Sequence, residues 1–176
     1  MSRFFPHPPY AEDQPLSHTI LTTHVLSRSI TTGTIIGITI TGIRQSIPSL
    51  RQPGHLPKKL LISSAHNILA TMAIASVGLT VRMWGRDAIE WEDRSWRLLE
   101  NRGQLETDDW TYGGIGVAAA VVALRGRTGP AKFGWKGVTG AMGIGSVGGL
   151  VGYLAWRYGI NRGRFVSKDE EKRKGL

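Results

Sequence analysis

Four apolar runs dominate the hydrophobic pattern of the chain, and each of them lacks charged residues. They cover residues 29–43, 60–81, 110–124 and 137–156. A bilayer core about 30 Å thick requires about 20 helical residues. The second and fourth runs reach this length alone, and arginines at the ends of the other two can extend their helices to the membrane surface. The pattern predicts transmembrane helices at about 24–46, 58–83, 110–126 and 135–157.

A second pattern lies between the second and third runs, where residues 86–102 have helical periodicity. Ala88, Ile89, Trp91, Trp96, Leu98 and Leu99 share one half of the helical wheel, and charged residues take most of the other half. Glu90 and Asp93 each precede an arginine by four residues, the favourable order for helical ion pairs. This predicts an amphipathic helix in an interface, and its mixed charge favours a protein partner over lipid headgroups.

These elements define the expected fold class and organisation. We expect an all-α membrane protein with four transmembrane helices and an amphipathic interfacial helix between the second and third. A Pro-rich extension covers 1–16, the four-span membrane domain covers 17–160, and a charged tail covers 161–176. An alternative stays open, in which the runs are buried core helices of a soluble domain and 31–43 is a strand, since Thr and Ile favour sheets.

The distribution of carboxylates favours the membrane. All 13 acidic residues lie within 12–13, 87–109 and 169–171, so the stretches between these segments contain none. A soluble domain would scatter carboxylates over all its exposed loops. In the two short links, at 48–59 and 126–136, lysine and arginine are the only charged residue types. The positive-inside rule therefore places both links on the inner side of the membrane. Both termini are then expected on the opposite side.

Charge and composition reduce the number of ligand classes that the chain is expected to bind. The net charge of +9 fits nucleic acid, anionic lipid or an acidic protein, but no basic and aromatic motif for nucleic acid is present. The chain has no cysteine, and no metal-ligand spacing accompanies His24 or His66. Residues 143–148 read G-x-G-x-x-G without the strand that a dinucleotide site needs. We expect that the chain is not an enzyme and that it binds no metal, no small-molecule substrate and no nucleic acid.

Helix contacts in lipid form where small residues let backbones approach. The first and fourth runs and the start of the third contain closely spaced glycines. The candidate helix-packing residues are Gly33, Gly37, Gly113, Gly114, Gly137, Gly145, Gly148, Gly149 and Gly152. We expect no cofactor, but the basic links offer candidate contacts to an anionic phospholipid such as cardiolipin. These contacts are Lys58, Lys59, Arg125, Arg127 and Lys132, which serve equally well as topology determinants.

Residues 88–118 resemble the signature of the Tim17/Tim22/Tim23 family of mitochondrial four-helix membrane proteins. The spacing of the signature is matched throughout, at Ala88, Trp91, Arg102, Glu106, Gly113, Gly114 and Ala118. Trp91, Glu106 and Ala118 depart conservatively from the family's Phe or Tyr, Asp and Gly. The resemblance implies a multi-pass protein of the mitochondrial inner membrane with both termini in the intermembrane space, in agreement with the charge pattern.

The same family contains protein translocase subunits and accessory subunits of respiratory complex I. Residues 92–114 and 152–159 also resemble fungal accessory membrane subunits of complex I, the NADH:ubiquinone oxidoreductase of the respiratory chain. This implies a non-catalytic subunit that packs on the membrane subunits of complex I and supports assembly or stability. The alternative is a Tim17/Tim22-type component of an inner-membrane protein translocase.

Overall fold

The computed structural model describes residues 4–51 and 53–165, so part of the expected tail at 161–176 and the first residues of the expected extension lie outside the described residues. These described residues form five α-helices. They are α1 (Ser17–Ser46), α2 (Leu56–Met83), α3 (Ala88–Glu100), α4 (Arg102–Arg125) and α5 (Gly134–Leu154). A π-helical turn, Ala155–Ile160, continues α5. The described residues contain no strand, so the expected all-α class is confirmed and 31–43 is helical.

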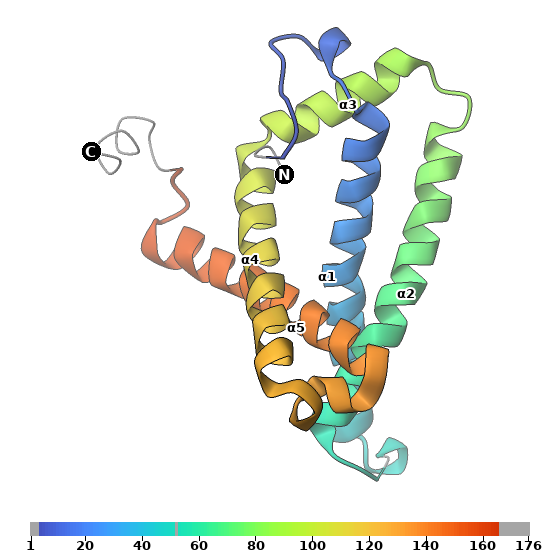
Figure 1. Ribbon diagram of the computed structural model, residues 1–176, viewed down its shortest axis with the longest axis vertical. Helices are drawn as coiled ribbons and strands as arrows, with labels where there is room; N and C mark the ends of the chain where they lie inside the picture. Colours follow the sequence, from blue (N-terminus) through green and yellow to red (C-terminus); the bar gives the residue numbers. More distant parts are fainter. Residues whose placement is uncertain (1–3, 52, 166–176) are drawn as a thin grey trace.

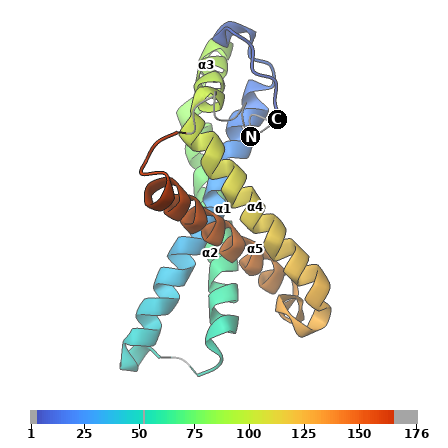
Figure 2. The ribbon, with the colours of Figure 1, turned by 90° about the vertical axis from the view of Figure 1, so that its left-hand side faces the viewer.

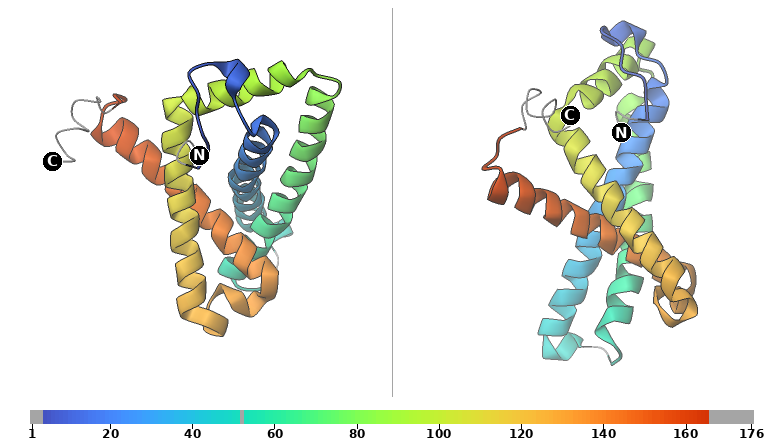
Figure 3. Two further views of the ribbon diagram at one scale, coloured as in Figure 1. Left: turned by 45° about the horizontal axis from the view of Figure 1, so that its top comes forward. Right: turned by 60° about the vertical axis from the view of Figure 1, so that its left-hand side comes forward.

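Helices α1 and α2 form a long antiparallel hairpin (Figure 1), and α4 packs mainly against α5. Helix α3 crosses one end of the molecule and connects α2 to α4. Helix α5 packs against α4 and also against α2 and α1, and it crosses α4 obliquely (Figures 2 and 3). Both short links between long helices lie at the end opposite α3, as in Figure 1.

Two helices begin earlier than the apolar runs indicate. Helix α1 begins at Ser17 rather than about residue 24, because its first turns pack under α3: the His18 ring stacks on Trp91 with centroids 4.0 Å apart, and Ile20 is buried with Leu99. Helix α4 begins at Arg102 rather than about residue 110. The Asn101 side chain accepts a hydrogen bond from the Gln104 backbone N–H at 3.2 Å and caps this helix.

The interior of the bundle contains many polar side chains beside apolar ones such as Ile20 and Ile68. Buried side chains include many hydroxyl groups and two charged groups, namely Ser29, Thr31, Thr34, Thr41, Ser64, Ser95, Asp108, Thr111, Ser146 and Arg157. Large apolar side chains lie outside: Val81 is 71% exposed and Leu124 is 87% exposed. In a soluble helical bundle most side chains of the core are apolar.

The described residues contain two helices that are long and apolar enough to cross a membrane. These are Leu56–Met83 and the continuous helical segment Pro130–Ile160. The other two long helices have lower average hydropathy because α1 is rich in threonine and α4 begins with a charged stretch. The four transmembrane spans therefore remain a prediction from the sequence.

Candidate functional site

Helices α1 and α2 meet at two glycines of α1. A Cβ atom placed on Gly37 would lie 2.7 Å from the Cα of Ser64, and one on Gly33 would lie 2.6 Å from the backbone oxygen of Asn67. The Ser63 hydroxyl donates to the Gly37 carbonyl at 3.0 Å. The two backbones are therefore in contact, and a hydroxyl from one helix binds a carbonyl of the other.

Helices α4 and α5 meet at a second glycine contact. Gly114 faces the Gly145 carbonyl so closely that neither residue has room for a side chain, and Gly149 lies against the Trp110 carbonyl. The Ala118 methyl group lies beside Gly145. Glycines are required here because any larger residue would separate the two helices.

The opposite face of α5 contacts the α1–α2 hairpin. Gly140 lies against the Leu61 carbonyl, Gly143 lies against Thr34, and the Ser146 hydroxyl is hydrogen-bonded to Thr31. Helix α5 therefore packs on two sides. Gly140 and Gly143 are not among the helix-packing residues predicted from the sequence. Their spacing of three residues, continued by Ser146, indicates a second small-residue face on α5.

The remaining glycines singled out from the sequence lie elsewhere. Gly137 lies against the Pro130 carbonyl in the α4–α5 link, and Gly152 lies beside the Trp110 ring. A Cβ placed on Gly113 or Gly148 would have no described atom within 4 Å beyond the neighbouring backbone of its own helix. Both line an open apolar groove of about 770 Å³ between α4 and α5, together with Val117, Val121 and Ile144.

A buried polar cluster joins α1 to α4 near the α3 end. Asp108 is 2% exposed, and its Oδ1 lies 2.7 Å from Nη2 of Arg28. The same nitrogen donates to Oε1 of Gln104 at 2.8 Å. The Nδ1 atom of His24 lies 3.9 Å from the second carboxylate oxygen of Asp108. The charges are thus compensated by side chains from two helices.

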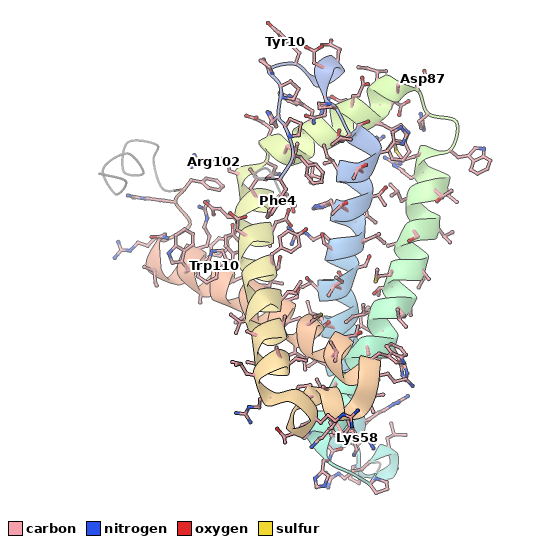
Figure 4. The ribbon with its side chains drawn as sticks, viewed as in Figure 1. Phe4, Tyr10, Lys58, Asp87, Arg102 and Trp110 are labelled. Carbon is pink, nitrogen blue, oxygen red and sulfur yellow. The ribbon has the colours of Figure 1, made fainter. Side chains whose placement is uncertain are left out.

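A second polar cluster joins α4 to the π-helical turn after α5. The Arg157 guanidinium lies 3.5 Å from Oε2 of Glu106 and donates to the Arg164 carbonyl at 2.7 Å. It also lies over the Phe165 ring, 3.5 Å from the centroid. Arg102 approaches the other side of this cluster, with its guanidinium 5.2 Å from the same ring; Figure 4 shows Arg102 and Trp110 on this part of α4.

Only Gly113, Gly114 and Ala118 of the family-like signature line the groove between α4 and α5, and its other residues lie elsewhere. Trp91 holds α3 to α1 through His18, Glu106 pairs with Arg157, and Gly114 contacts α5. Each of these contacts joins two helices. Among the described residues, no group of three or more His, Cys, Asp or Glu side chains is arranged to hold a metal ion.

The candidate lipid contacts separate into two groups. Lys58 and Lys59 line a pocket of about 430 Å³ between α1 and α2, which Arg44 also lines. Lys132 lies over the Phe133 ring at 4.9 Å, and Lys58 approaches the same ring at 5.7 Å. Arg125 and Arg127 lie at the α4–α5 link, where neither lines that pocket.

Comparison with known proteins found no relative of the chain. No family model, no curated protein and no solved structure matches the chain.

Proposed function

We propose that the chain is a four-span protein of the mitochondrial inner membrane and a non-catalytic accessory subunit of complex I. It packs on membrane subunits of that complex and supports assembly or stability. The observation that carries the membrane part is that many hydroxyl groups and two charged groups are buried between helices, whereas many large apolar side chains are exposed. Hydrocarbon favours this arrangement, because backbones and polar side chains must find partners inside the protein.

The lower hydropathy of α1 and α4 is compatible with four spans. In α1 the buried positions hold Thr31, Thr34 and Thr41, whereas Ile35 and Ile36 are exposed. In α4 the exposed side chains beyond Trp110 include Val117, Val121 and Leu124. The outward surfaces of both helices are thus more apolar than their average composition.

Charges at the two ends support the proposed sidedness. The α1–α2 and α4–α5 links carry basic residues and share one end of the molecule, whereas α3 and the first turns of α4 hold the described acids beyond residue 86 at the other end (Figure 1). The basic end faces the matrix in our proposal, and the termini face the intermembrane space.

The role as an accessory subunit comes from the resemblance to complex I subunits, and the surfaces of the bundle support it. The ionisable groups at these helix contacts compensate one another, Arg28 with the buried Asp108 and Glu106 with the buried Arg157. The groove beside Gly113 and Gly148 leaves an apolar surface where a transmembrane helix of a larger partner fits.

A Tim17/Tim22-type translocase component is the alternative. Such a protein would present a polar cavity to the membrane interior for a precursor chain. The groove between α4 and α5 is instead lined almost entirely by glycine and apolar side chains, with Asp109 at one end. This lining favours helix packing over passage of a polar polypeptide.

Fractionation of mitochondria that carry a tagged full-length chain tests the proposal. We expect the chain to stay in the membrane pellet after carbonate extraction and to co-migrate with NADH dehydrogenase activity on native gels. Release by carbonate would refute the membrane assignment. Migration with a protein translocase would replace the complex I assignment by the alternative.

A further inference from the structure

The pocket between α1 and α2 lies at the basic end of the molecule, where Figure 4 labels Lys58. It is formed by the last turns of α1, the link at 53–55 and the first turns of α2. Its polar and charged lining consists of Thr41, Arg44, Gln45, His55, Lys58, Lys59, Ser63, His66 and Asn67. Ile40, Pro53 and Ile62 are its apolar lining residues.

Positive charge in this pocket is not neutralised by its lining. None of the lining residues is acidic, and residues 14–86 contain no carboxylate. The described carboxylates that form ion pairs lie on α3 and the first turns of α4, at the opposite end of the bundle. Lys59 is held at the pocket by a 3.3 Å hydrogen bond from its Nζ to Oε1 of Gln45.

The lining matches the chemistry of a phosphate group. Guanidinium and ammonium groups bind phosphate oxygens by charge-assisted hydrogen bonds, and hydroxyl and amide groups add neutral donors. Apolar residues continue from the pocket along the outside of α1, where Ile36 and Ile43 are exposed. Acyl chains attached to the phosphate can lie along this surface.

We propose that this pocket binds the phosphate headgroup of an anionic phospholipid, with Arg44 and Lys59 as the principal ligands. The proposal rests on the membrane part of the proposed function and is independent of the partner complex. Lys58 and Lys59 line the pocket and are expected to affect lipid binding. Arg125 and Arg127 carry the same charge at the same end of the molecule but do not line the pocket. These two arginines supply a matched control.

Native mass spectrometry of the purified full-length chain, in neutral detergent with added lipid, tests the site. We expect the wild-type chain to retain cardiolipin in preference to phosphatidylcholine. The double variant R44Q/K59Q should lower cardiolipin retention about tenfold or more, since each basic residue near an anionic headgroup contributes about 1 kcal/mol. The control R125Q/R127Q should remain within about twofold of wild type.

A charge-preserving variant and free phosphate complete the experiment. R44K/K59R should retain most of the binding, and unchanged circular dichroism should show that R44Q/K59Q is folded. Equal losses in R44Q/K59Q and R125Q/R127Q, or equal retention of phosphatidylcholine and cardiolipin, would overturn the proposal. Displacement of cardiolipin by millimolar inorganic phosphate would identify free phosphate as the ligand and overturn the lipid assignment. Failure of the chain to associate with complex I would leave these results unaffected.

Discussion

Arg28 on α1 and Asp108 on α4 form an ion pair with a distance of 2.7 Å between Nη2 and Oδ1. The two helices do not pack along their length, so this pair and the neighbouring bond from Arg28 to Gln104 join them near the α3 end. The pair couples the α1–α2 hairpin to the α4–α5 pair, and α5 couples the same two units by its two-sided glycine packing.

Replacement of Asp108 by alanine should destabilise the fold by about 3 kcal/mol, because Arg28 would lose the carboxylate that compensates its partly buried charge. The unfolding midpoint, followed by tryptophan fluorescence in detergent micelles, measures this change. Asp93→Ala is the control, since Asp93 pairs with Arg97 on the exposed face of α3 and should change stability by less than about 1 kcal/mol. Equal effects of the two variants would contradict the importance of the buried pair.

Gly113 and Gly114 are adjacent in α4 but face different surroundings. Gly114→Ala should destabilise the chain by about 1–3 kcal/mol, because the new methyl group would overlap the Gly145 backbone. Gly113→Ala should leave stability unchanged or raise it by up to about 1 kcal/mol, since alanine favours the helix and no described atom lies nearby. Unfolding midpoints of both variants under the same conditions compare them directly. A larger loss in Gly113→Ala would show that the α4–α5 interface is not the one described.

The open groove yields a prediction about assembly. Gly148 lines the groove, and a Cβ placed on it has no described neighbour outside its own helix within 4 Å. Gly148→Leu should therefore extend into the groove and leave the unfolding midpoint of the isolated chain unchanged. If a partner helix occupies the groove, the variant should lower co-migration with complex I by about tenfold, since overpacking of a close interface disfavours it by 1–3 kcal/mol. Native gels of mitochondria with the tagged variant measure this ratio, with Leu69→Met, an exposed position on α2, as the control. Normal co-migration of Gly148→Leu would place the partner on another face.

The cap at Asn101 determines where α4 begins. Asn101→Ala should destabilise the first turn of α4 by about 1 kcal/mol, because the Gln104 backbone N–H loses its acceptor. Hydrogen exchange at residues 102–105 should accelerate by about fivefold. Asn101→Asp retains an acceptor oxygen and should preserve the protection. Unchanged exchange in Asn101→Ala would indicate that tertiary contacts, such as that of Arg28 with Gln104, hold this turn without the cap.

Sequence patterns located the helices well because helix formation depends on local composition and periodicity. The charge-free runs predicted the positions of α1, α2, α4 and α5, and the periodicity of residues 86–102 predicted a helix there, where α3 runs from Ala88 to Glu100. The predicted starts of α1 and α4 were less accurate. His18 and Asp108 belong to helical turns outside the apolar runs, and contacts with Trp91 and Arg28 from distant segments hold their side chains.

The candidate site was only partly predictable for the same reason. The spacing of Gly33 and Gly37 shows that a helix backbone can be approached closely there, but not which helix approaches it. Gly113 and Gly114 look alike in the sequence, and only the crossing of α5 makes one a contact and leaves the other open. The pairing of Glu106 with Arg157 likewise joins residues that are far apart in the chain.

By itself the sequence determined the all-α class, the places of the helices, and the separation of basic links from acidic segments, since these depend on residues close together along the chain. The tertiary structure alone decided that α5 packs on two sides, that Arg28 meets Asp108, and that Arg44 and Lys59 share a pocket. Such contacts depend on how helices cross in space, and backbone geometry at a few small residues sets those crossings.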